Sequence, residues 1–479
     1  MFASTADSEV GPVTINTLPD DVLLLVFRFD RLTYLDELRY FPRARSVFWR
    51  WHRLIQVCRR WRAVVFESPN FLNLRLVCGP RAPTELTGIW PPLPIAITNY
   101  LDRQFPEDYD FDSAIVHHNR RVYEIYLVGL NSSALQRLAS AMQVPFPALI
   151  NLRLQFDDSR PAPVLPNGFL GASAPNLQSL ELYHIPFPAL PKLILSTTGL
   201  VHLTLSSIPH SGYFSPEAMV TGLAVLVSLE SLTITFESPL SRPDRETQRL
   251  PLPILNVLPT LTRFVFNGAS EYLEHLVARL DTPSLDSIWV TFFHQLIFTI
   301  PQLAQFMRRT PRFLALNEAH VDFDDSGVQV VPLPLLDEKP KLRISFRELD
   351  WQLSSLAQVF TSFFPSIDMV KHLYIHRLRN LPLQWQDDIE NWQWLEILAP
   401  FTAVKELYVC KEFAKRIAFA LQELVGRRVM DVLPALGCLS LEELQLSEPV
   451  QEAIVQFVAA RRLFGRPVAV LDWEDWVRI

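Results

Sequence analysis

Glycine and cysteine are scarce in this sequence, and each shortage excludes a class of protein. Only 14 of the 479 residues are glycine, with no Gly-x-Gly pattern and no glycine followed by lysine. Dinucleotide-binding turns and P-loops need those patterns, because only glycine lets the backbone approach a phosphate closely. Four cysteines without a Cys-x-x-Cys pair do not make a disulfide scaffold. We therefore expect no cofactor, no bound metal and no catalytic residues in this chain.

An excess of basic charge and a long apolar run are also missing. The 44 basic residues against 51 acidic ones give a net charge of −7, whereas a nucleic-acid binder carries a basic footprint. The longest apolar-looking stretch, residues 289–306, is interrupted by His294, Gln295 and Pro301. It falls short of the roughly 18 uninterrupted apolar residues of a membrane span. The first ten residues lack a signal-peptide pattern. We expect a cytoplasmic or nuclear protein, or one found in both compartments, with no nucleic-acid or membrane partner.

His372 and His376 are the strongest hint of a metal site, since their spacing would place them on one face of a helix. Leu373 and Ile375, however, alternate with these histidines and with Tyr374, which indicates a strand. Along a strand the two histidines would lie about 13 Å apart, too far to share one ion. The pattern therefore predicts a strand without a metal.

Two apolar helices are predicted near the N-terminus. Pro19 suits the first position of a helix, and Asp20 and Asp21 follow at the positive end of its dipole. Residues 22–27 are apolar on every side, so this short helix must be buried or must meet a partner. A second amphipathic helix is expected over residues 51–66. Its apolar residues recur at helical spacing: Trp51, Leu54, Ile55, Cys58, Trp61 and Val65.

Positive charge is concentrated around these helices. Residues 13–62 contain ten arginines, no lysine and five acidic residues, a net charge of +5. With −7 overall, the rest of the chain holds −12. This asymmetry is either a solvated surface or a basic docking module, in which charge steers the encounter with an acidic partner.

Together these residues resemble an F-box. The resemblance rests on two groups in order: Leu18, Pro19, Asp21, Val22, Leu23, Val26 and Phe27, then Leu54, Val57, Cys58, Arg59, Arg60 and Trp61. Residues 68–77 and 89–95 are similar to a form of F-box protein common in fungi. The segment from Arg28 to Arg50 is longer than the compact F-box pattern and would add a loop or a short helix.

The resemblance implies binding of a Skp-type adaptor. The residues it assigns to this contact are Leu18, Pro19, Leu23, Val26, Phe27, Leu54, Cys58 and Trp61. Each could instead pack inside the F-box itself. For Trp61 the two roles are evenly balanced, whereas Leu18 and Pro19, at a helix entrance, favour the adaptor.

From residue 121 onward one apolar pattern recurs, in which apolar residues stand at the first, fourth and sixth positions. Its first seven copies begin at Val122, Leu149, Leu177, Leu200, Leu229, Leu261 and Leu285. Their offsets of 27, 28, 23, 29, 32 and 24 residues bracket the period of a leucine-rich repeat. Further copies begin at Val370, Val404 and Leu441. The expected fold is α/β, a small helical F-box followed by an irregular leucine-rich-repeat-like solenoid with a parallel sheet.

Each copy predicts a short strand whose apolar residues face the interior. Residues 216–227 and 272–280 are expected to be helical, whereas 236–255 and 322–340 indicate loops rich in proline and charge. The predicted divisions are a disordered tail (1–12), the F-box (13–80), a linker and cap (81–120), the solenoid (121–448) and a C-terminal cap (449–479).

The outward positions of these strands form the expected surface for a protein substrate. They include arginine and aromatic residues, the types that dominate interfaces, although any single one could simply be exposed. The candidates are Arg153, Tyr183, His202, Arg263, Trp289, His372, Tyr374 and Tyr408.

The sequence thus predicts a non-catalytic receptor subunit of an SCF-type ubiquitin ligase. Its F-box would hold a Skp-type adaptor and, through it, cullin and RING subunits. Its repeats would hold an unknown protein substrate. The alternative is a leucine-rich-repeat scaffold with a non-ubiquitin role.

Overall fold

The computed structural model describes two compact units of the chain. The first comprises Met1–Arg160 with Phe169–Gly171, and the second comprises Pro161–Gly168 with Ala172–Ile479. The described residues are 15–29, 50–69, 71–72, 74–78, 93–99, 117–243, 255–293, 300–310, 317–324, 327–331, 341–347, 357–358, 360–361, 367–377, 390–424, 426–442 and 448–472. The expected tail (1–12), residues 30–49 of the F-box insertion and most of the expected linker (81–120) lie outside these ranges. None of the described helices has the length and apolar character to cross a membrane.

The first unit contains the N-terminal helices and a parallel sheet of strands paired in sequence order, β1 to β4. Residues 20–29 are helical, as the Pro19 and Asp20 signals predict. The other helical segments are η1 (Ile15–Thr17), α2 (Arg50–Val57), α3 (Arg59–Glu67) and α6 (Ser132–Ala141). The short helix η2 (Phe169–Ala172) has its first three residues in this unit and its last in the second. The strands are β1 (Leu76–Cys78), β2 (Ile95–Thr98), β3 (Val122–Leu130) and β4 (Asn151–Phe156).

The single helix expected over 51–66 is in fact two helices, α2 and α3, separated by Cys58. The backbone of Cys58 is extended (φ −158°, ψ 170°), and its Sγ accepts a hydrogen bond from the Trp61 N–H at 3.4 Å. Cys58 is therefore the N-cap of α3, a position that sits outside helical geometry. Apolar spacing runs unbroken across this cap, which is why periodicity alone misses it.

The second unit is a larger sheet flanked by helices. Its strands lie in the order β5-β6-β7-β9-β11-β14-β13-β12-β15-β16-β17-β18, with β8 and β10 forming a separate pair. The bounds are β5 (Ser179–Tyr183), β6 (His202–Ile208), β7 (Ser231–Phe236), β8 (Asn256–Val257), β9 (Arg263–Gly268), β10 (Leu280–Asp281), β11 (Ser287–Phe292), β12 (Glu318–Asp324), β13 (Gly327–Val331), β14 (Lys341–Arg347), β15 (His372–Arg377), β16 (Glu406–Val409), β17 (Cys438–Leu441) and β18 (Ala469–Asp472). The helical segments are α7 (Leu190–Ile194), η3 (His210–Gly212), α8 (Pro216–Leu223), α9 (Ser270–Val277), α10 (Pro301–Arg309), η7 (Ile367–Met369), α12 (Asn391–Leu398), α13 (Lys411–Gln422), η8 (Gly426–Met430) and α14 (Glu448–Leu463).

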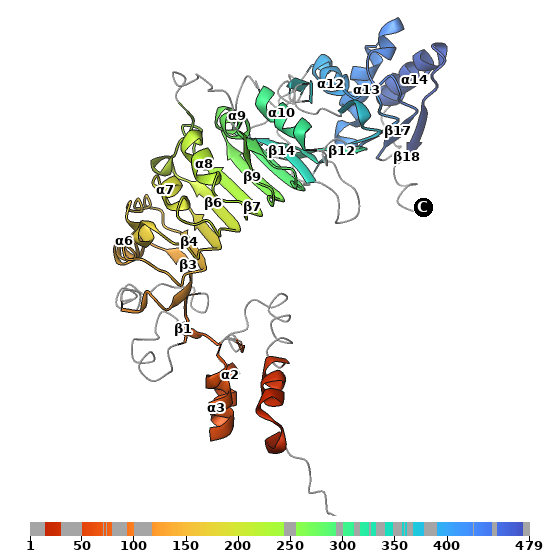
Figure 1. Ribbon diagram of the computed structural model, residues 1–479. Coiled ribbons are helices and arrows are strands. Elements are labelled where there is room, and N and C mark those ends of the chain that lie inside the picture. The colour runs from red at the N-terminus through yellow and green to blue at the C-terminus, as the bar shows by residue number, and fades with distance from the viewer. Residues whose placement is uncertain are drawn as a thin grey trace, which may run out of the picture. The chain divides into compact units, whose positions relative to one another are not determined.

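Alternation along the strands separates a helix-covered face from an open one. In β5 the leucines Leu180 and Leu182 are buried and the residues between them are half-buried, and β7, β9 and β11 alternate in the same way. In Figure 1, α7 to α10 lie on one side of the strands that they follow. Further along, Phe323 of β12 packs against Phe413 of α13 at 4.8 Å between ring centroids. We call the opposite face of the second unit's sheet, built from the residues that alternate with the buried ones, the open face.

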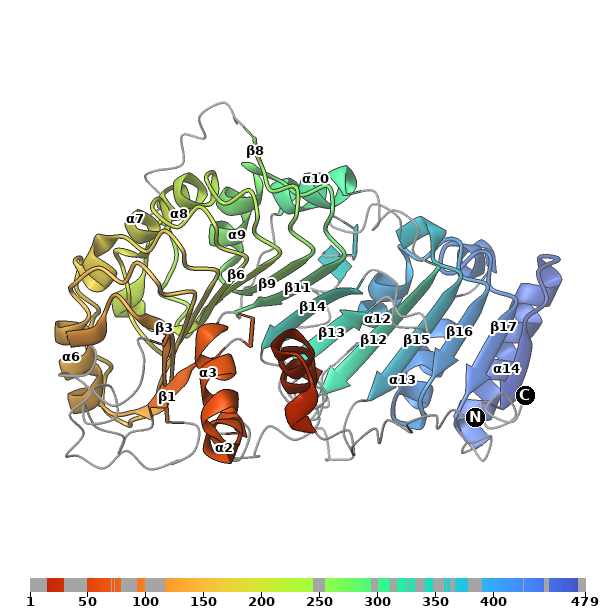
Figure 2. The same ribbon diagram turned by 60° about the horizontal axis from the view of Figure 1, so that its bottom comes forward.

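The prediction of a loop over 322–340 is wrong for its first half, where the structure has the end of β12 and all of β13. β12 continues to Asp324, β13 pairs with it antiparallel, and β13 then pairs antiparallel with β14. β14 in turn lies parallel to β11, and β12 lies parallel to β15 (Figure 2). The chain therefore folds back on itself within an otherwise parallel sheet. The acidic residues of β12 are typical of a loop, which is why the sequence predicted one. The alternation of Val321 and Phe323, both buried, is the signal that indicates a strand.

The last repeat uses a different frame from the one expected. The pattern beginning at Leu441 is replaced by one beginning at Leu436, with Leu436, Leu439 and Leu441 buried and β17 ending at Leu441. Both frames satisfy the same apolar spacing, and hydrogen bonds to the preceding repeat decide between them. The N–H groups of Gly437 and Cys438 both donate to the carbonyl of Lys405, which fixes β17 beside β16.

A helix and a strand follow at the C-terminal end, α14 and β18, as expected. The side chain of Arg461 on α14 is fully buried and donates to the carbonyls of Val429, Pro434 and Leu436 at 3.3, 3.2 and 3.0 Å. One guanidinium thus satisfies one backbone acceptor of η8 and two of the loop between η8 and β17, because its planar fork offers donors in several directions.

Candidate functional site

The N-terminal helices form one packed cluster in the first unit. The ring of Phe27, on helix 20–29, lies 4.7 Å from that of Trp61 on α3. Arg60 of α3 pairs with Asp20 at 2.6 Å and donates to the carbonyl of Leu18, so it holds the start of helix 20–29. The two sequence segments that resemble an F-box therefore contact each other.

The residues assigned to adaptor binding differ in how accessible they are. Leu23 and Phe27 are buried, so in the free protein they act by packing. Pro19 and Val26 are exposed. The remaining four are half-buried, namely Leu18, Leu54, Cys58 and Trp61. In the part of the chain that the structure describes, Trp61 Nε1 is buried and has no acceptor.

Val26, 42% exposed, was among the residues expected to bind the adaptor, but sequence reasoning missed three more exposed apolar residues of this cluster. Leu25 is 58% exposed, and Phe29 and Val57 are at least as exposed. The signal was present, because Leu25 and Phe29 stand four residues apart and so share a helix face. The F-box resemblance drew attention to neighbouring positions instead. An apolar surface on a small helical cluster is typical of an interaction site.

On the sheets, arginine lies over an aromatic ring of the next strand. In the first unit, the guanidinium carbon of Arg153 is 5.1 Å from the ring centroid of Tyr126. In the second unit, Arg263 stands 5.1 Å from the ring centroid of Trp289. Both contacts are cation–π geometries. His202 is exposed, and Tyr183 is half-buried and donates to Glu181 at 3.0 Å.

Three rings stack across β12, β15 and β16 on the open face. The centroids of His320 and Tyr374 lie 4.2 Å apart and those of Tyr374 and Tyr408 also 4.2 Å, with interplanar angles of 8° and 6°. His376 stacks against the same group at 5.3 Å from His320. Tyr408 was expected to be exposed, yet it is only 5% exposed because it lies in this stack. The stack holds each ring in one orientation.

Glu406 connects this stack to its neighbours. Its Oε2 accepts from the Tyr408 hydroxyl at 2.6 Å and lies 3.0 Å from Nδ1 of His372. His372 and His376 both lie on strand β15, as the alternation predicts.

The titration of these groups is shifted mainly by burial. Burial, with a smaller contribution from His376, lowers the pKa of His320 to about 4, so this ring is neutral near pH 7. Burial, the hydrogen bond to Glu406 and the charge of that carboxylate raise the pKa of Tyr408 far above its usual range. The pKa of Tyr374 is also raised, first by burial and then by the charge of Glu318. Near neutral pH the stacked rings of His320, Tyr374 and Tyr408 are therefore uncharged.

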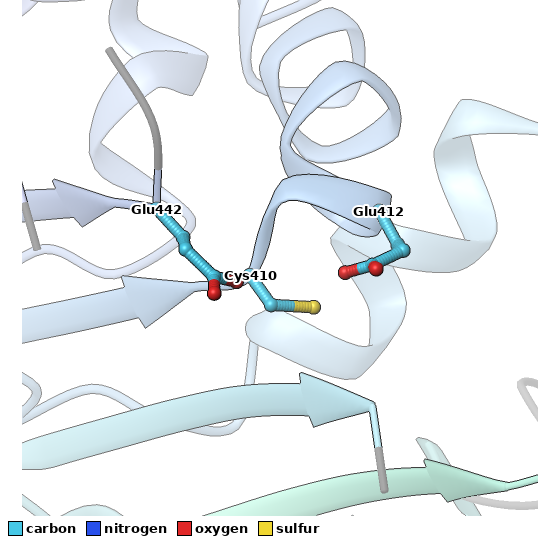
Figure 3. Close-up of side chains that lie close together, drawn as sticks. All are labelled: Cys410, Glu412 and Glu442. Carbon is cyan, nitrogen blue, oxygen red and sulfur yellow. The ribbon is translucent and has the colours of Figure 1, made fainter. Parts of the chain in front are cut away.

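A cysteine and two glutamates meet at the start of α13 (Figure 3). The ligand-type atoms of Cys410, Glu412 and Glu442 all lie within 4.8 Å of one another. Burial and Glu412 raise the pKa of the Cys410 thiol to about 12. Glu442 accepts the Lys411 N–H at 3.3 Å, and Glu412 pairs with Arg377 at 3.6 Å. Each carboxylate thus has a structural role, one of them at the N-terminus of α13, and the thiol is neutral.

Comparison with known proteins adds little. No protein-family model matches the sequence, and no curated protein matches it. Among solved structures, the leucine-rich repeat-containing protein LegL7 from Legionella pneumophila is similar over 62% of this chain and 84% of its own, at 15% identity and a TM-score of 0.26. A score this low carries no argument, so the fold rests on the pairing and burial described above.

Proposed function

We propose that this chain is the substrate-recognition subunit of an SCF-type ubiquitin ligase. In this proposal the helical cluster of the first unit binds a Skp-type adaptor, which connects the chain to cullin and RING subunits. The repeats of the second unit hold a protein substrate.

One observation carries the proposal: the helical cluster that resembles an F-box exposes apolar side chains beside basic ones. Leu25, Val26 and Val57 are exposed, as are Arg28 and Arg59. Apolar area supplies affinity when it is buried against a partner. Positive charge around it would steer an acidic partner and set the orientation of the complex.

The proposed mechanism is proximity. Binding adaptor and substrate on one chain raises the effective concentration of the substrate near the ubiquitin-conjugating enzyme. The chain then needs no reactive group of its own. The substrate would lie on the open face, where strands present side chains on a stiff sheet.

The test is co-purification of a Skp-type adaptor with the full chain, comparing the wild type with Leu25→Ser/Val26→Ser. Fully burying one large apolar side chain contributes about 1.5–3 kcal/mol, and Leu25 and Val26, at 58% and 42% exposure, together expose about as much as one such side chain. Losing both should therefore weaken the complex by about 10- to 150-fold. The matched control is Leu240→Ser/Val257→Ser, which removes two residues of similar exposure (65% and 50%) from the second unit.

We expect the wild type and the control to retain the adaptor and the helix variant to lose it, with unchanged circular dichroism. A wild type that binds no adaptor overturns the proposal. If the adaptor binds but no bound protein is turned over in a ubiquitin-dependent manner, the chain is instead a scaffold with a non-ubiquitin role.

A further inference from the structure

Strand register places two carboxylates on either side of a histidine on the open face. Glu318 of β12 is aligned with His372 of β15, which is aligned with Glu406 of β16. Strands in a sheet lie about 4.8 Å apart, so the backbones of the two glutamates are about 10 Å apart. His372 lies between them with its Nδ1 3.0 Å from Glu406 Oε2, so an incoming ammonium or guanidinium group would approach either carboxylate from the solvent side.

The open-face positions of β12, β15, β16 and β17 include acidic residues, whereas β14, two strands from β12, carries Lys341 and Arg343 at positions aligned with Ser287 and Trp289 of β11. Among the described open-face positions of β12, β15, β16 and β17 there is no lysine or arginine. The nine positions whose side chains are described are Glu318, His320, His372, Tyr374, His376, Glu406, Tyr408, Cys438 and Ser440. Arg377, at the end of β15, is half-buried and pairs with Glu412. On β5, β6, β7, β9 and β11, by contrast, the described open-face positions include one acidic residue, Glu181, and one basic residue, Arg263. The end of the sheet nearer the C-terminus is therefore the acidic one.

The carboxylates at the C-terminal end of the sheet act on the titration of Tyr374 in the ring stack. The charges of Glu318 and Glu406 both add to burial in raising the pKa of the Tyr374 hydroxyl. Glu406 is itself half-buried, at 28% side-chain exposure, where a charge is screened less than in open water.

The ring stack makes this surface stiff. His320, Tyr374 and Tyr408 are fixed by stacking at 4.2 Å, so a ligand need not order them. Aromatic edges provide apolar area for the methylene stems of lysine or arginine, whose charged heads reach the carboxylates.

We propose that this acidic aromatic face, defined by Glu318, His320, His372, Tyr374, Glu406 and Tyr408, binds an extended basic segment of a protein. The inference rests on the proposed function, because it names the class of substrate that the repeats would hold. Recognition is by charge complementarity between lysine or arginine side chains and the two glutamates.

The experiment measures fluorescence anisotropy of labelled peptides with the full chain. One peptide alternates arginine with serine and the other glutamate with serine. Each has about eight residues, enough to cross the face at about 3.3 Å per residue. We expect the arginine peptide to bind more tightly, and its affinity to fall as salt concentration rises. Glu318→Gln/Glu406→Gln should weaken it by about tenfold.

Glu181→Gln is the matched control for Glu406→Gln. Glu181 also accepts a hydrogen bond from the tyrosine two residues later, Tyr183, yet lies on β5 away from the acidic end. Glu318→Gln alone serves as a second variant if Glu406→Gln disturbs the stack. The proposal is overturned if both peptides bind equally, or if Glu181→Gln weakens binding as much as Glu406→Gln does.

Adaptor retention is measured on the same preparations, which separates the two proposals. Retention of the adaptor without preference for the arginine peptide overturns this inference and leaves the ligase proposal standing. Preference for the arginine peptide without adaptor binding overturns the ligase proposal and leaves a receptor for basic segments.

Discussion

Removing the buried arginine of α14 should open the C-terminal end of the second unit. The perturbation is Arg461→Met, which keeps an unbranched side chain of similar length but donates no hydrogen bond. Three carbonyls, those of Val429, Pro434 and Leu436, then lose the donors that now lie 3.0–3.3 Å away. A buried acceptor left unpaired costs about 1–3 kcal/mol, so three could cost about 3–9 kcal/mol.

Part of this loss is offset, because methionine does not have to be stripped of water as a guanidinium does. No carboxylate accompanies Arg461 among its described hydrogen-bond partners, and burial lowers its pKa. Replacing buried charged groups with apolar ones can recover about 1–4 kcal/mol. We therefore expect a net destabilisation of about 2–5 kcal/mol, at the larger end of single substitutions.

Hydrogen exchange measured by mass spectrometry is the suitable assay, because repeat arrays can open locally. Exchange should accelerate in η8, β17 and α14 while β5 to β9 stay unchanged. The control is Arg462→Met, since Arg462 is the exposed neighbour on the same helix. If Arg461→Met exchanges like the wild type, the three hydrogen bonds contribute nothing net and the reasoning is refuted.

Three further predictions concern single side chains. Burial raises the pKa of Glu274 to about 7, although it accepts two N–H bonds at the start of α10. Its raised folded-state pKa favours the protonated form. Its contribution to stability is therefore present below about pH 4.5 and is lost as pH rises through about 7. The free energy of unfolding should fall more between pH 5 and 8 in the wild type than in Glu274→Gln, by up to about 3 kcal/mol, and the melting temperature should follow it; equal pH dependence in the two proteins would contradict this. Cys410, whose pKa is raised to about 12, should resist iodoacetamide at pH 8 in the folded chain and react once urea unfolds it; rapid labelling of the native protein would count against its burial. A Cβ added at Gly212 would lie 2.6 Å from Cα of Pro186, so Gly212→Ala should lower the urea midpoint by the equivalent of about 1–3 kcal/mol, and an unchanged midpoint would show that the backbone moves aside.

Local pattern predicted the strands well and their neighbours poorly. The copies beginning at Leu177 and Leu229 each become a strand, because alternating burial depends only on residues close together in the sequence. The fold-back of β13 could not be predicted, since it depends on which strand the chain meets next. The break between α2 and α3 was not predicted, because Cys58 fits the apolar helical spacing and is at the same time the N-cap of α3.

The candidate sites divide in the same way. Arginine and aromatic side chains on the open face were found by alternation. The contact between Glu406 and His372 on the neighbouring strand, and the burial of Tyr408 in a stack, depend on cross-strand register, which a single sequence does not specify. The exposure of Leu25 depends on how helix 20–29 packs on α3.

The fold-back of β12 to β14 also bears on how the second unit assembles. Parallel neighbours need long crossovers, so they form slowly, whereas adjacent antiparallel strands are close in sequence and can pair early. Among the described strands, β5 to β11 on one side and β15 to β18 on the other are joined through this trio. Shortening it would leave β11 and β15 to pair directly or not at all. The three strands β12 to β14 thus mark the position at which the second unit can be divided into two fragments, β5 to β11 and β15 to β18, whose folding kinetics can be measured separately.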